Sequence, residues 1–150
     1  MSTTTSSSSV VSSPKVALGK LLWVGPLAIV GSVVANVFVR FVAVAVLNPP
    51  AEFLPLNIAQ PIVLTVVGVV LAIVAFALVA RFARNPIRTY QIVAAVALVV
   101  SLAPDVLLLA NAGSAPFPGV NVGTVGALML MHGVAWAICV AMFTNLTLEK

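Results

Sequence analysis

Apolar residues dominate the chain in four long runs, which shorter polar or Pro-rich segments separate. About 20 consecutive apolar residues in helical form are enough to cross the hydrocarbon core of a bilayer. Each run approaches or exceeds that length. The sequence therefore predicts an all-α protein, a four-helix transmembrane bundle of up-down-up-down topology. The predicted helices cover about residues 21–47, 60–80, 87–110 and 124–146.

Proline and asparagine mark the ends of these runs. Asn48 and the two prolines after it end the first run, and Pro61 lies in the first turn of the second. A proline there does no harm, because its missing N–H would have no partner in the helix. Asn85 suits the N-cap of the third helix, and Pro86 suits its first turn.

The chain divides into a Ser/Thr-rich N-terminal tail, residues 1–19, and a four-span membrane domain, residues 20–150. We expect the tail to be disordered because it has almost nothing to bury. A cleaved signal peptide is the alternative, since residues 43–45 (Ala-Val-Ala) resemble a cleavage site. The apolar core of a signal peptide is usually only about 7–15 residues long, however.

Composition supports the membrane assignment. The chain is 62% hydrophobic and only 7% charged, whereas a soluble domain carries about 25% charged residues. Lipid can solvate the apolar outer faces that water could not. The net charge of +4 has no basic patch interleaved with aromatics, so we expect the lipid bilayer as partner and no nucleic acid.

Lysine and arginine are distributed unevenly among the connections. The N-terminal flank, the 81–88 loop and the C-terminus carry them, whereas the 48–59 and 111–123 loops carry none. The positive-inside rule then places both termini in the cytoplasm. We expect a multi-pass protein of the cell (plasma) membrane.

Cofactor chemistry has few candidate ligands. The chain has one cysteine, Cys139, and one histidine, His132. One chain can therefore form no internal disulfide and no site that needs two thiols or two imidazoles. We expect no metal and no cofactor in a single chain.

Polar side chains inside the spans gather at one depth. A helical rise of about 1.5 Å per residue places Arg40 roughly 30 Å and Asp105 roughly 25 Å above the inner surface. His132 lies about 12 Å below the outer surface by the same measure. We predict an outward-facing polar pocket or interhelix pairing among Asn36, Arg40, Gln60, Ser101, Asp105 and His132.

Asp105 is the most informative of these residues. A carboxylate in lipid is expensive, and its short side chain cannot reach the interface easily. We expect Asp105 to face the bundle interior and to pair with Arg40, the only opposite charge at that depth. A structural clamp between two helices is the favoured interpretation of that pair. The alternative is that Arg40 only extends to the outer headgroups.

Pro104 predicts a local break in the third helix. It cannot donate to the carbonyl of Val100, and the Ser101 hydroxyl could help to satisfy that carbonyl. The alternative is that Pro104 only marks the end of the helix.

Several short motifs occur in a recognisable order along the chain. They are Phe53-Leu54-Pro55-Leu56 before a helix with Pro61, Thr65 and Gly68, then Ser101-Leu102 to Pro104, and Met131-His132. With these motifs the chain resembles an uncharacterised bacterial family of four-helix integral membrane proteins, which is classed only as a domain of unknown function. The resemblance covers roughly residues 20–148. It implies a four-span bundle and no established activity, and it supplies no catalytic residues.

Three functions remain open. The favoured hypothesis is a non-enzymatic membrane protein, structural, accessory or regulatory, acting as a homo-oligomer or in a larger membrane complex. The first alternative is binding or transport of a small polar or anionic ligand in the polar pocket. The second is a membrane enzyme that uses Asp105 and His132 as an acid–base pair. We assign no catalytic residue.

Overall fold

The computed structural model describes residues 15–149, and within them the chain is helical. This part of the chain has no strand apart from an isolated bridge between Val16 and Leu148. The all-α prediction is confirmed, and each predicted helix boundary lies within two residues of the observed one. The elements in order are η1 (Leu18–Lys20), α1 (Leu21–Leu47), η2 (Leu54–Leu56), α2 (Ala59–Phe82), α3 (Pro86–Ala110), η3 (Ala112–Ser114) and α4 (Val122–Leu146).

All four long helices are long and apolar enough to cross a membrane. Their outward faces carry large apolar side chains that no other part of the described chain covers. Leu22 is 84% exposed and Phe38 is 68% exposed. Such faces need an apolar surrounding. These features are those of a multi-pass membrane protein.

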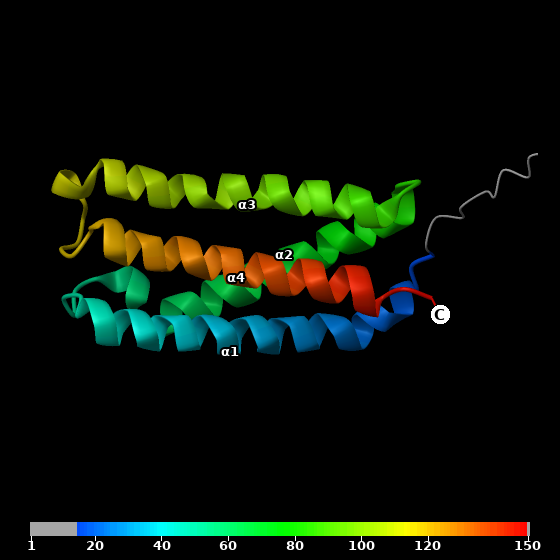
Figure 1. Ribbon diagram of the computed structural model, residues 1–150, viewed down its shortest axis with the longest axis horizontal. Coiled ribbons are helices and arrows are strands. Elements are labelled where there is room, and N and C mark those ends of the chain that lie inside the picture. The colour runs from blue at the N-terminus through cyan, green and yellow to red at the C-terminus, as the bar shows by residue number, and fades with distance from the viewer. Residues whose placement is uncertain (1–14, 150) are drawn as a thin grey trace, which may run out of the picture.

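The helices form a bundle with their long axes roughly aligned (Figure 1). α1 packs against α2 and α4, and α3 packs against α4 and α2. Figure 1 shows α2 and α3 meeting at their short connection and diverging away from it.

Small residues on α1 allow its close packing. Ala28 and Ser32 are fully buried, and Asn36 is nearly so. Their spacing of four residues puts them on one face. Small side chains on such a face let neighbouring helices approach closely.

Three aromatic rings hold α2, α3 and α4 together near the α2–α3 connection. The ring of Phe76 lies 4.9 Å from that of Tyr90 and 5.4 Å from that of Phe143, between centroids. All three side chains are buried. Edge-to-face and tilted pairs of this kind add about 0.5–1.5 kcal/mol each beyond their burial. This cluster keeps the helices together at that end.

At the opposite end the two long loops pack on each other. The rings of Phe53 and Phe117 meet edge to face at 5.5 Å between centroids. Gly119 has a φ of +90°, and a Cβ placed on it would lie 2.7 Å from Cδ of Pro50. Only glycine adopts this conformation readily and leaves room for Pro50.

The two ends of the described chain are joined. The backbone N–H of Ala17 donates to the carbonyl of Thr147 at 2.9 Å, and Nζ of Lys20 donates to the carbonyl of Leu148 at 2.6 Å. The prediction of a disordered tail is therefore wrong for residues 15–19, because these residues are paired or helical. The rest of that tail lies outside the described residues.

Pro104 lies inside α3, which continues to Ala110. The alternative that Pro104 marks the helix end is therefore wrong. The Ser101 hydroxyl donates to the carbonyl of Leu98 at 2.8 Å. The prediction that this hydroxyl bonds the carbonyl of Val100, which Pro104 leaves without a donor, is therefore wrong.

Candidate functional site

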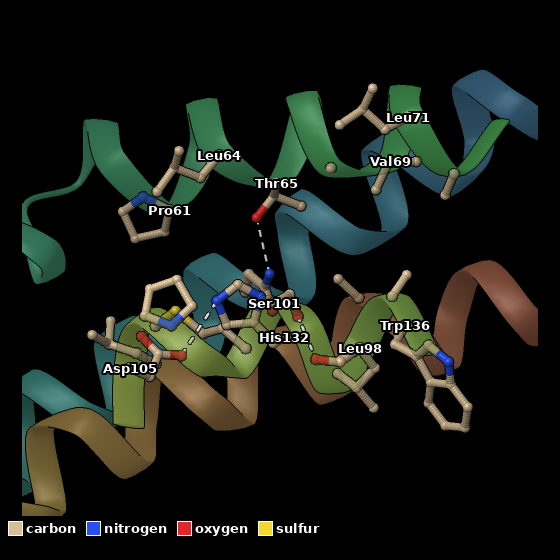
Figure 2. Close-up of a pocket in the computed structure, with 18 of the residues that line it drawn as sticks. Pro61, Leu64, Thr65, Val69, Leu71, Leu98, Ser101, Asp105, His132 and Trp136 are labelled. Carbon is tan, nitrogen blue, oxygen red and sulfur yellow. Dashed lines mark hydrogen bonds and ion pairs between the residues drawn. The ribbon is translucent and has the colours of Figure 1, made fainter. Parts of the chain in front are cut away.

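A cavity of about 820 Å³ lies where α2 and α3 diverge. α2 forms one wall, α3 and α4 form the other, and Asn36 of α1 also lines the cavity. Figure 2 shows Pro61, Thr65 and Val69 on the α2 side, facing the helices that carry Asp105 and His132. The side chains of the cavity therefore come from all four helices.

The α2 wall consists of one helical face. Pro61, Thr65, Gly68, Ala72 and Ala75 line the cavity, and their spacing of three or four residues keeps them on the same side of the helix. Most of these side chains are small. A Cβ added to Gly68 would meet no atom within 4 Å, which leaves the cavity unfilled at this point.

The cavity is open on one side. Leu64 and Leu71 line it, yet they are 63% and 64% exposed. Both residues lie on α2, one of the four helices long and apolar enough to cross a membrane. The cavity is therefore accessible between helices, at a level where lipid tails would surround the protein.

Asp105 and His132 form the polar end of the cavity. Oδ2 of Asp105 lies 3.4 Å from Nε2 of His132, and the two side chains are 11% and 40% exposed. No hydrogen bond joins these atoms, and Oδ2 is buried without any hydrogen-bond partner in the described chain. The Asp105 carboxylate therefore keeps an acceptor available.

Asn36 provides a second acceptor. Its Nδ2 donates to the Thr65 hydroxyl at 2.9 Å and so joins α1 to α2. Its Oδ1 is buried and has no partner among the described residues. A buried polar atom without a partner usually costs about 1–3 kcal/mol, so such atoms call for an explanation.

The expected contact between Arg40 and Asp105 is replaced by two separate contacts. Asp105 lies beside His132. Arg40 donates from Nε to the carbonyl of Leu56 at 2.8 Å and lies over the ring of Phe41. Arg40 thus joins α1 to the loop that precedes α2, and it does not line the cavity.

The structure brings five of the six predicted site residues to this cavity and leaves out Arg40. Those that line it are Asn36, Gln60, Ser101, Asp105 and His132.

Thr65 and Trp136 also line the cavity, although neither was predicted as a site residue. The signal for Thr65 was its place on the face of small residues that includes Pro61 and Gly68. Trp136 lies one helical turn after His132, so its position followed from that of the histidine.

The chemistry of the cavity is that of a binding site with one polar end. Most of its lining is aliphatic or aromatic, and no lysine or arginine of the described chain lines it. Among residues 15–149 no group of three or more His, Cys, Asp or Glu side chains could hold a metal ion. Cys139 lies buried in the wall as a free thiol.

Comparison with known proteins gives a family and no activity. A family described as a family of unknown function (DUF6069) matches residues 16–147. The match covers all four long helices and every residue named in the cavity. No curated protein and no solved structure matches the chain.

Proposed function

The chain belongs to DUF6069, a family of unknown function, and we propose that it is a non-enzymatic multi-pass membrane protein that binds a small amphipathic molecule between α2 and α3. The observation that carries this proposal is the cavity of about 820 Å³ with apolar walls and a polar end. Small-molecule sites typically have volumes of about 300–1,000 Å³ and combine apolar walls with a few polar groups.

The route into the cavity favours a ligand dissolved in the bilayer. The exposed side chains of Leu64 and Leu71 border the opening. A molecule with an apolar tail can pass such side chains without losing favourable contacts. Its polar group would then reach Asp105 and His132, whose side chains can form hydrogen bonds with it.

The orientation is part of the proposal. We place both termini in the cytoplasm of a plasma-membrane protein, with helices that alternate in direction. The Lys/Arg residues of the N-terminal flank and of the 81–88 loop support this orientation. The polar end of the cavity then lies in the outer half of the membrane.

The other hypotheses stay predictions. An accessory or regulatory role, and assembly as a homo-oligomer or in a larger membrane complex, would be compatible with ligand binding. The anionic ligand loses its main support, because Arg40 lies outside the cavity. An enzymatic role for the Asp105–His132 pair would require a substrate that reaches both side chains.

A single-tryptophan protein tests the binding proposal. Trp136 lines the cavity, and the other tryptophan, Trp23, is 51% exposed, so Trp23→Phe leaves one reporter. Bromine quenches tryptophan on contact, and we would titrate this protein in lipid nanodiscs with bromoundecanol. We expect saturable quenching of Trp136.

Two glycine variants provide the matched comparison. Gly68→Leu fills the cavity and should weaken the binding roughly tenfold, since the leucine occupies the space of the tail. Gly133→Leu also enters open space but lies outside the cavity, and it should leave the binding unchanged. The three proteins compared are Trp23→Phe alone and Trp23→Phe with either glycine substitution. Equal, non-saturable quenching in all three would show only probe dissolved in lipid and would overturn the proposal.

A further inference from the structure

We infer that the polar group recognised in the cavity is a positively charged hydrogen-bond donor, an ammonium group on an apolar tail, held by Asp105 and Asn36. This inference rests on the proposed function. It adds the chemical class of the ligand, which the cavity volume alone does not give.

Two unpartnered acceptors carry the inference. Oδ2 of Asp105 and Oδ1 of Asn36 are buried without hydrogen-bond partners in the described chain. Both residues line the cavity and are only 8% and 3% exposed. A donor group placed between such acceptors removes the cost of leaving them unpaired. An ammonium group has N–H donors and no acceptor, which suits both atoms.

The charged residues around the cavity also favour a positively charged ligand. Asp105 is the only acidic residue in the four long helices, and within residues 15–149 no lysine or arginine lines the cavity. Arg40, the one basic residue inside a span at this depth, bonds the carbonyl of Leu56. Within the described residues, His132 is the ionisable side chain paired with the carboxylate, at 3.4 Å from Asp105. A bound cation would therefore meet an uncompensated carboxylate whenever His132 is neutral.

One unpartnered donor, Nε1 of Trp136, also lies in the cavity wall. Figure 2 shows its indole turned away from Asp105. Trp136 also lies one helical turn beyond His132, about 6 Å along α4. The Trp136 donor and the Asp105 carboxylate thus lie at separate places in the cavity wall, so this donor does not supply the partner that Asp105 lacks.

Three probes with one tail and different head groups test the inference. We would titrate the Trp23→Phe protein in nanodiscs with bromoundecylamine, bromoundecanol and bromoundecanoate near neutral pH, where the amine is protonated. We expect the amine to bind roughly tenfold or more tightly than the alcohol, as a charge-assisted hydrogen bond implies. The carboxylate should bind most weakly.

Variants assign this preference to Asp105. Asp105→Asn should bring the affinity for the amine to that for the alcohol. Glu52→Gln removes an acidic residue that is exposed and outside the cavity, and it should preserve the preference. A circular-dichroism spectrum shows whether each variant is folded. The preference of the unsubstituted protein decides the question even if Asp105→Asn fails to fold.

The outcomes separate this inference from the proposed function. Saturable binding of all three probes without preference for the amine would overturn the ammonium assignment and leave the binding function intact. A lack of saturable binding by any probe would overturn both. Quenching by brominated phosphatidylethanolamine and not by brominated phosphatidylcholine would identify a lipid headgroup as the source of the ammonium. Quenching by the amine alone would identify a free molecule.

Discussion

Asn36 and Thr65 show how one polar contact inside a span positions the site. The bond from Nδ2 of Asn36 to the Thr65 hydroxyl joins α1 to α2. It also holds Asn36 at the cavity, with the amide oxygen Oδ1 buried and without a hydrogen-bond partner in the described chain. The same residue therefore holds two helices together and presents an acceptor to a ligand.

Thr65→Val should lower the free energy of unfolding by about 1 kcal/mol, because it leaves the buried amide of Asn36 without its acceptor. Valine has nearly the same shape as threonine, so packing changes little. The measurement is unfolding by denaturing detergent from mild micelles. In a protein that already carries Asn36→Leu, the Thr65→Val substitution should cost much less. Equal costs in both backgrounds would show that the hydrogen bond is not the cause.

Arg40 shows the limit of sequence reasoning at the residue scale. The helical rise gives the depth of Arg40 and Asp105, and this depth suggested a pair. Depth does not give the direction in which each side chain leaves its helix axis. The carbonyl of Leu56, in a 3₁₀ turn that the sequence did not reveal, receives the guanidinium instead. Asn36, Ser101 and Asp105 nevertheless line the same cavity, because they share a depth and all three lie on inward faces.

At the scale of elements, the helices could be predicted well and the loops could not. Asn48 with a φ of 44° ends α1, and Asn121 forms a capping box with Thr124 at the start of α4. These ends depend on local residue chemistry, which the sequence displays. The contact between the two long loops depends on the arrangement of the whole bundle, so no local pattern indicated it.

Gly119→Ala should destabilise the contact between these loops. A side chain at a φ of +90° is strained by about 1–2 kcal/mol, and its Cβ would lie 2.7 Å from Cδ of Pro50. We expect a lower unfolding temperature and faster amide hydrogen exchange in residues 48–58. Gly113→Ala is the control, since its Cβ would meet no atom within 4 Å. If both variants behave alike, the close approach to Pro50 is unimportant.

At the scale of the whole molecule, the four spans followed from the apolar runs, whereas the cavity did not. Its volume depends on the divergence of α2 and α3 (Figure 1). The aromatic cluster holds the two helices together at one end, and the small side chains along α2 leave the space beyond it unfilled. The divergence therefore depends on residues from several helices, and no single run of residues encodes it. The sequence therefore predicted which residues gather and left open the space between them.

The orientation can be tested with single cysteines in a Cys139→Ala protein. Ser114→Cys and Glu149→Cys both replace exposed residues, in the loop after α3 and at the C-terminal end. A membrane-impermeant maleimide should label Ser114→Cys in intact cells and Glu149→Cys only after permeabilisation, as the Lys/Arg distribution indicates. The reverse labelling pattern would invert the proposed orientation.

The packing of α1 on α4 also has a consequence for the order in which the bundle forms during synthesis. The first helix enters the membrane before the ribosome has made the last one. Until α4 arrives, the face of α1 that carries Ser32 lacks one of its two helix partners. A nascent chain that stops before Val122 should therefore expose this polar face to lipid or to an insertion chaperone. The packing of this face of α1 is therefore complete only once α4 has joined the bundle.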